Sequence, residues 1–566
     1  MEESFEFFEY SLDDFVISDK ENKRKQRKKI IIIVTTISVS IILIVAFVCI
    51  ILNVNEYKRE QGNQDTQAVQ RNLIPGEIKC IYQTYEENQT IDLINLLENN
   101  EVINYSLTID EEKFGHNSSN TSHTFTRKGK HKVNFIFNNT LTSLAYLFKG
   151  IKDLIEIDIS ELRSEDITSL QEAFSQCINL KSVKINFLGE NKINNISYLF
   201  YNCSSLQSLE LNFNAEKVIE MQNMFMNCES LTSVDLTKFN TKNLKNMSHM
   251  FDSCTELIYI DISTFQFEKV EDISFAFQSC LNLKNIKFPK SNTNNLLYMN
   301  GIFKGLKEIT KLDIDFLRTD KVTEMVNVFM HCSKVEKLDV SHFDTSKVQN
   351  MEGLFSYMDS ITSLELSNFE FRNVVSLEST FKRCIRLVFL NLSFADTPKV
   401  VSMVETFKEC RRLKTVKLPK NLTNVKYLSG MFHYCDVLEY VDLSSLNGNQ
   451  DIITMNLFFS FCYKLKNVTF PKIVAKKLKS LENIFYSCGE LEYIDMGDFI
   501  TEDLESMSGM FANCLNLKFI NISKFDTTKV KSYIDIFSGV DILNLNIVLP
   551  GGGNNNLELL HELGRD

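Results

Sequence analysis

The stretch NMSHMFDSCTELIYIDISTF, residues 246–265, joins a phenylalanine (Phe251) to a cysteine three residues later and then to an alternating apolar run. The same pattern returns along the chain at steps of 25 to 27 residues. Its phenylalanine anchors are Phe148, Phe174, Phe200, Phe225, Phe251, Phe277, Phe303, Phe329, Phe355, Phe381, Phe407, Phe432, Phe459, Phe485, Phe511 and Phe537. A period of this length and regularity is typical of a repeat array. We therefore predict that residues 144–549 form one solenoid.

Each repeat has two halves with different hydrophobic periods. In residues 244–251 the apolar side chains are spaced by three and four, which predicts one face of a short helix. In residues 257–262 they alternate, which predicts a strand with one buried face. One repeat cannot bury its own apolar side, so stacked repeats must share a core. The sequence thus predicts an α/β solenoid of about 16 coils, with a parallel β-sheet on one face and short helices on the other.

Two repeats, LTSVDLTKFNTKNLKNMSHMF (231–251) and VEKLDVSHFDTSKVQNMEGLF (335–355), carry a family resemblance. In order, spacing and residue type they resemble the BspA-like leucine-rich repeat family, and the resemblance covers nearly every unit from Leu144 to Val540. It implies a surface-exposed leucine-rich repeat protein that is adhesive or interacts with a host.

Some repeats depart from that family pattern. Leu317 and Leu446 stand where phenylalanine is usual, and three repeats carry Pro289, Pro419 or Pro471 in place of the serine that ends the strand. Because proline removes a backbone donor, we expect these changes to weaken strand pairing locally and to do no more.

The cysteines are predicted to be structural. Of the fourteen in the chain, those that stand three residues after an anchor are Cys177, Cys203, Cys228, Cys254, Cys280, Cys332, Cys384, Cys410, Cys435, Cys462, Cys488 and Cys514. Other repeats place Ile151, Leu306, Met358 or Val540 there, and a buried packing position tolerates that exchange. Zinc or redox sites are disfavoured because C-x-x-C is absent and His is sparse. We expect no cofactor and no metal, although bridges between neighbouring coils are not excluded by distance.

A membrane anchor is predicted near the N-terminus. Residues 30–52 form an uncharged segment that is long enough for a single transmembrane helix. No signal-peptide cleavage site follows this segment, which favours a retained signal-anchor. The basic run KRKQRKK (23–29) precedes it, so the positive-inside rule places the N-terminus in the cytoplasm and the repeats outside the plasma membrane.

The expected domain order follows from these segments. We predict a cytoplasmic tail (1–29), the transmembrane helix (30–52), a polar stalk (53–72), a small β-rich cap (73–143), the solenoid (144–549) and a C-terminal tail or cap (550–566). The outer part contains N-x-S/T sequons, which makes the chain a candidate glycoprotein. They are Asn88, Asn104, Asn117, Asn120, Asn138, Asn195, Asn202, Asn246, Asn391, Asn421, Asn467 and Asn521.

A candidate ligand face is predicted on the outward rows of the sheet. Acidic and aromatic side chains recur there, a mixture that suits protein recognition. The candidates are Asp235, Asp261, Asp313, Asp339, Glu365, Tyr259, Tyr440 and Tyr493. The alternative is that each acid only accepts local hydrogen bonds within its repeat.

The expected function is adhesion or protein recognition through the repeat array. The partners are a protein or glycan ligand on host or neighbouring cells, with the membrane crossed by a single span. A net charge of −12 disfavours nucleic acid. No catalytic constellation is found, so we expect neither an enzyme nor a small-molecule substrate. The alternative is a cell-surface signalling receptor that uses the N-terminal cytoplasmic tail.

Overall fold

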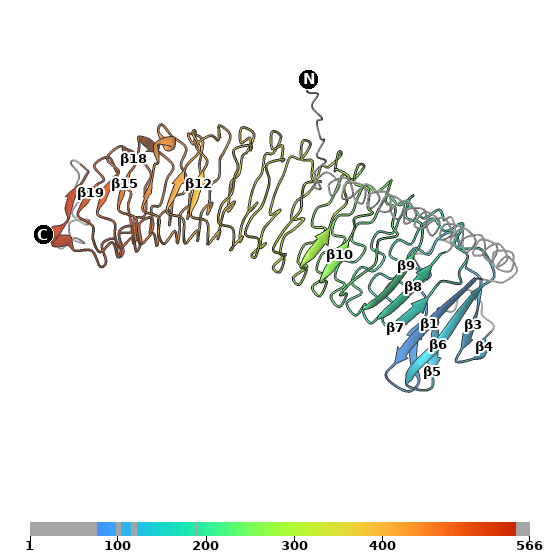
Figure 1. Cartoon of the computed structure of the whole chain (residues 1–566). Helices are drawn as coiled ribbons and strands as arrows, with labels where there is room; N and C mark the ends of the chain where they lie inside the picture. Colours follow the sequence, from blue (N-terminus) through green and yellow to red (C-terminus); the bar gives the residue numbers. More distant parts are fainter. Residues whose placement is uncertain (1–75, 98–102, 115–120, 188–190, 551–566) are drawn as a thin grey trace, which may run out of the picture. The chain divides into compact units, whose positions relative to one another are not determined.

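The computed structural model describes residues 76–97, 103–114, 121–187 and 191–550. It begins with antiparallel strands: β1 (Gly76–Thr84), β2 (Gln89–Asp92), β3 (Tyr105–Ile109), β4 (Glu112–Phe114), β5 (Ser122–Phe125) and β6 (Gly129–Phe137). β1 pairs with β6 on one side and with the first strand of the array, β7 (Leu154–Asp158), on the other. The antiparallel region therefore continues directly into the sheet of the array (Figure 1).

The array contributes one short strand from each of many successive coils. After β7 these are β8 (Ser182–Asn186), β9 (Ser208–Asn212), β10 (Tyr259–Asp261), β11 (Asn285–Lys287), β12 (Phe389–Asn391), β13 (Thr415–Lys417), β14 (Tyr440–Val441), β15 (Asn467–Thr469), β17 (Tyr493–Asp495), β19 (Phe519–Asn521) and β20 (Asn546–Val548). Equivalent residues pair in parallel, as in Ile260 with Ile286. Two further strands, β16 (Ile473–Ala475) and β18 (Phe499–Thr501), pair on another side of the coil, and η1 (Ser444–Leu446) and η2 (Ile542–Asn544) are single 3-10 turns.

The core is a continuous column of the anchor phenylalanines. Neighbouring rings from Phe148 to Phe537 have centroids 5.4 to 6.4 Å apart and planes within 2° to 21° of parallel. Offset stacking of this kind adds about 0.5–1.5 kcal/mol per pair to the burial of each ring. The period seen in the sequence therefore becomes a single stack inside the solenoid.

The helices predicted on the face opposite the sheet are wrong. The residues two before and two after each anchor have positive φ, as in Asn223 (57°) and Asn227 (61°) on either side of Phe225, and a right-handed helix cannot contain them. Hydrogen bonds within the coil close tight turns, such as Cys228 N to Phe225 O at 3.0 Å, in which the third residue, Asn227, has the positive φ that a type II turn requires.

The backbone on this face also bonds to the next coil. The amides of Asn223, Phe225 and Asn227 donate to carbonyls of residues 248, 250 and 252 at 2.9 Å. Successive turns place every third or fourth side chain inward, which is the spacing of a helix. The sequence pattern thus identified the buried residues correctly and the backbone wrongly, and the fold is a β-solenoid instead of an α/β one.

The transmembrane part of the predicted fold is not supported either. Within the described ranges, none of the helices has the length and apolar character needed to cross a membrane. The span predicted over residues 30–52 lies outside those ranges, as do the predicted tail (1–29), the stalk (53–72) and most of the C-terminal segment (551–566). The capping role predicted for residues 73–143 stays a prediction.

Candidate ligand-binding face

The outward rows of the sheet expose several large aromatic side chains. Tyr259 on β10, Phe389 on β12 and Tyr440 on β14 are 43%, 46% and 59% exposed. Tyr493 is half-buried because its ring stacks on Phe519 of the next coil at 4.7 Å. Of the aromatic candidates, Tyr259 and Tyr440 are therefore open to solvent, and Phe389 is a further exposed ring in the same row.

Most of the acidic candidates on this face are used within their own repeat. Asp235 Oδ1 accepts from the backbone amide of Thr237 at 2.9 Å and from its hydroxyl at 2.6 Å. Asp339 and Glu365 accept from the amides two residues later at 2.9 Å. These bonds favour the ionised carboxylate and lower the pKa of Asp235, Asp339 and Glu365 below their usual values. Each of the three therefore stabilises a local turn of its own repeat.

Asp261 and Asp313 have additional partners across the face. Asp261 accepts from the Ser263 hydroxyl at 2.6 Å and pairs with Lys287 Nζ of the next coil at 2.9 Å. The serine bond, together with the lysine, holds the pKa of Asp261 well below its usual range. The Asp313 side chain is 71% exposed and forms an ion pair with Lys311 at 2.5 Å.

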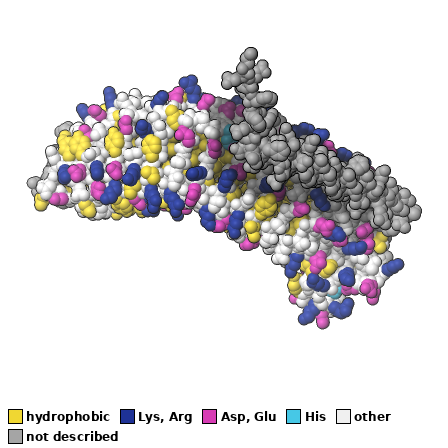
Figure 2. Space-filling view, viewed as in Figure 1, with side chains coloured by type: hydrophobic (Ala, Val, Ile, Leu, Met, Phe, Trp, Pro, Cys, Tyr) yellow, Lys and Arg dark blue, Asp and Glu magenta, His cyan; other side chains and the backbone are white. Residues whose placement is uncertain are grey.

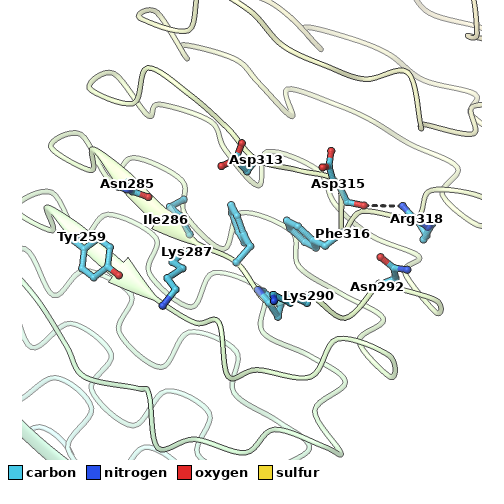
Figure 3. Close-up of a pocket in the computed structure, with 12 residues that line it drawn as sticks. Tyr259, Asn285, Ile286, Lys287, Lys290, Asn292, Asp313, Asp315, Phe316 and Arg318 are labelled. Carbon is cyan, nitrogen blue, oxygen red and sulfur yellow. Dashed lines mark hydrogen bonds between the residues drawn. The ribbon is translucent and has the colours of Figure 1, made fainter. Parts of the chain in front are cut away.

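A first hollow, named hollow A, lies beside β11 and has a volume of about 660 Å³. Its wall includes Tyr259, Lys287, Pro289, Lys290, Phe316 and Arg318. Figure 3 shows Phe316 between Lys290 and Asp315, whose backbone carbonyl accepts from Arg318 at 2.8 Å. The Phe316 ring stacks on Phe288 at 4.5 Å and forms an apolar floor.

A second hollow, named hollow B, repeats this arrangement beside β13 with the same volume of about 660 Å³. Its wall is formed by Phe389, Ser393, Thr415, Val416, Lys417, Leu418, Pro419, Lys420, Tyr440, Asp442, Ser444 and Ser445. Both hollows belong to repeats with the Pro-Lys pair (Pro289–Lys290 and Pro419–Lys420). Where other coils bury a phenylalanine such as Phe265, these repeats have Ser291 and Asn421, and the smaller side chains leave room.

The hollows are what the sequence analysis missed. The sequence does mark both places, because Pro289 and Pro419 depart from the repeat pattern. That departure alone predicts only weaker strand pairing and not a hollow. Acidic and basic side chains are interspersed along the array, and neither sign of charge dominates the visible face (Figure 2). Any charge at a hollow therefore comes from the few residues that line it. In the described ranges no group of His, Cys, Asp and Glu is arranged to hold a metal ion.

The array cysteines lie in the core and not on this face. All twelve are buried, and each thiol donates to the carbonyl of the anchor phenylalanine one coil earlier, as in Cys254 Sγ to Phe225 O at 3.1 Å. Burial disfavours the thiolate and raises the pKa of Cys177 and Cys410 to about 12. Within the described residues every cysteine is a free thiol.

The sequons are spread over different sides of the coil. Asn88, Asn104, Asn138, Asn391 and Asn467 are exposed, whereas Asn195, Asn202, Asn246, Asn421 and Asn521 are partly buried. Asn117 and Asn120 lie outside the described ranges. Some amides already serve the fold: Asn521 Nδ2 donates to Asp495 Oδ1 at 2.8 Å. Glycosylation stays a prediction.

Two family models match the chain. The model described as "Mycoplasma protein of unknown function, DUF285" matches residues 122–233, 168–288, 282–389 and 479–549, together more than half of the chain. The model described as "BspA type Leucine rich repeat region (6 copies)" matches residues 378–502. No curated protein matches the sequence.

Solved leucine-rich repeat structures are also similar in part. A leucine-rich repeat protein from Eubacterium ventriosum shares 15% identity with a TM-score of 0.32, over 58% of this chain and 87% of that one. A leucine rich cell surface protein from Faecalibacterium prausnitzii shares 15% identity with a TM-score of 0.28, over 79% and 94%. With scores this low, neither likeness carries an argument about this chain.

Proposed function

We propose that this chain, which belongs to the DUF285 family and carries BspA-type leucine-rich repeats, is a recognition protein of the cell surface. The resemblance to BspA-type repeats noted in the sequence is confirmed by the family match. In this proposal the array faces the outside of the cell and binds a protein or glycan ligand on a host or neighbouring cell, without catalysis.

The observation that supports this proposal is the exposure of Tyr259, Phe389 and Tyr440 on one sheet face. Aromatic side chains are normally buried in a solenoid core, and here the core column already contains its own ring from every coil. Exposed aromatic residues that rim small hollows are typical binding hot spots, because they bury a large area with little loss of side-chain entropy. The sheet face therefore suits binding.

Adhesion of cells that display the full-length chain tests this function. The Phe389→Ser/Tyr440→Ser double variant should reduce adhesion about tenfold or more, because two hot-spot side chains of ~1–2 kcal/mol each are removed. Serine is compatible with the strand, since Ser208 occupies the equivalent position in β9.

The matched control is Tyr298→Ser. Tyr298 is 56% exposed but lies on a different ladder of the coil, where it bridges to Asp272. Undiminished adhesion of the double variant, or an equal loss in the control, would contradict the proposal. Cleavage of the array by protease added to intact cells tests its outward location, and full protection would contradict that part.

A further inference from the structure

We propose that hollow B binds an anionic sugar, a single pyranose unit that bears a carboxylate or sulfate group. This inference rests on the proposed recognition function and specifies the chemistry of one ligand. It is argued from the charge, the rings, the hydroxyl groups and the size of the hollow.

The wall of hollow B has two lysines and one acid, Asp442, so its net charge is positive. Lys417 and Lys420 are both exposed, and among the described residues neither ammonium group has a carboxylate within ion-pair distance. In hollow A, by contrast, Lys287 is already neutralised by Asp261 at 2.9 Å. On a chain with net charge −12, two unpaired lysines at one hollow complement one anionic group.

The rings of hollow B are arranged to hold a flat ligand. Phe389, Thr415 and Tyr440 are register partners on the adjacent strands β12, β13 and β14. Two strand spacings place the ring-bearing Cα atoms ~10 Å apart. A pyranose ring in van der Waals contact on both sides needs two spacings of ~4 Å, or ~8 Å in total. This spacing leaves room for one sugar ring between the two aromatic side chains, over Thr415 on the middle strand.

The hollow also presents polar groups that suit sugar hydroxyls. Ser445 Oγ is shielded from solvent and has no hydrogen-bond partner, although Ser445 lines the hollow. Asp442 Oδ1 accepts from the Ser444 amide at 2.8 Å, so the carboxylate is fixed in place as an acceptor. An unsatisfied buried hydroxyl is costly, and turning the Ser445 side chain toward the hollow would let a ligand hydroxyl remove that cost.

Size and the surrounding charges favour a small ligand over a macromolecular one. A volume of about 660 Å³ lies in the range of small-ligand sites, about 300–1,000 Å³, whereas a stable protein partner covers ~800 Å² of each surface. Asp339 and Glu365 stand on the same outward row between the two hollows, so a continuous polyanion would meet repulsion there. The ligand is therefore a short anionic unit, such as the end of a glycan.

Titration of the full-length protein with defined methyl glycosides tests the proposal. The probes are methyl glycosides of N-acetylneuraminic acid, glucuronic acid and galactose 6-sulfate, with methyl galactoside as the uncharged control, followed by saturation-transfer NMR. At least one anionic glycoside should bind ten times more tightly than methyl galactoside, and the preferred probe distinguishes carboxylate from sulfate. The Lys417→Gln/Lys420→Gln variant should lose this preference, and binding should weaken as salt is raised.

Lys472→Gln is the matched control, because Lys472 follows Pro471 in the third Pro-Lys repeat but lines neither hollow. It should bind as the unsubstituted protein does. Equal affinity for charged and neutral glycosides, or tight binding of an oligoglutamate peptide in their place, would overturn the inference. If adhesion depends on Phe389 and Tyr440 while no glycoside binds, the anionic-sugar inference fails and the recognition function stands.

Discussion

At the scale of single residues, the anchor phenylalanine and its cysteine form one buried unit per coil. The ring stacks on the rings before and after it, and the thiol bonds to the carbonyl of the preceding anchor. This explains why cysteine is exchanged for Leu306 or Met358 in other coils, since an aliphatic side chain keeps the packing and gives up only a weak bond. At the hollows, by contrast, the exchange does not preserve the packing, because Ser291 or Asn421 is smaller than the phenylalanine that other coils bury there.

Buried thiols make stability depend on alkaline pH. Burial raises the folded-state pKa of Cys177 and Cys410 from the ordinary value of 9.0 to about 12. A raised pKa gives stability that is complete below pH 9 and is lost as pH rises toward 12, because the unfolded chain releases the proton first. We expect the urea midpoint to fall over this range. The Cys410→Leu variant, which copies Leu306, should fall less steeply, and an unchanged slope would contradict this account.

At the scale of secondary structure, the turn face shows what a sequence can and cannot predict. The period and the inward-facing residues followed directly from the spacing of apolar side chains. The helix did not form, because successive tight turns produce the same spacing, with positive φ at the residues two before and two after each anchor. Asn and Gly, which tolerate positive φ, occupy many of these positions but not all, as Glu172 and Gln176 show.

The hollows were not predicted because Pro289 and Pro419 by themselves indicate only a change at the strand end. The space becomes visible only in the folded coil, where Ser291 and Asn421 stand in place of the phenylalanine that other coils bury.

One turn position allows a matched test of this backbone. Gln176 (φ 63°) is exposed, and Gly150 (φ 76°) occupies the same position one coil earlier with open space around its Cβ direction. Gln176→Gly should raise the free energy of unfolding by ~0.5–1 kcal/mol, whereas Gly150→Ala should lower it by ~1 kcal/mol, because only glycine adopts this conformation without strain. Urea denaturation measures both, and shifts of the same sign would contradict the turn assignment.

At the scale of the whole array, each coil contacts only its neighbours, so coils should be removable units. Deleting residues 330–355 joins Phe329 to the next repeat and restores the spacing to Phe381. We expect the protein to keep its far-UV circular dichroism per residue within about 10%. Deleting only half of that coil, residues 343–355, breaks the register and should expose the following coils to limited proteolysis. Equal behaviour of the two deletions would show that the register between coils is not what holds the array.

The backbone bonds between successive coils also determine how the array responds to tension. These hydrogen bonds run parallel to the direction in which the coils stack. A force applied along that direction should therefore break the bonds of one coil before those of the next. Each coil of about 26 residues then releases roughly 90 Å of extended chain, at ~3.4 Å per residue. Under load, such a tether lengthens in discrete steps and dissipates work at each one, while the coils that have not yet opened keep their binding face intact.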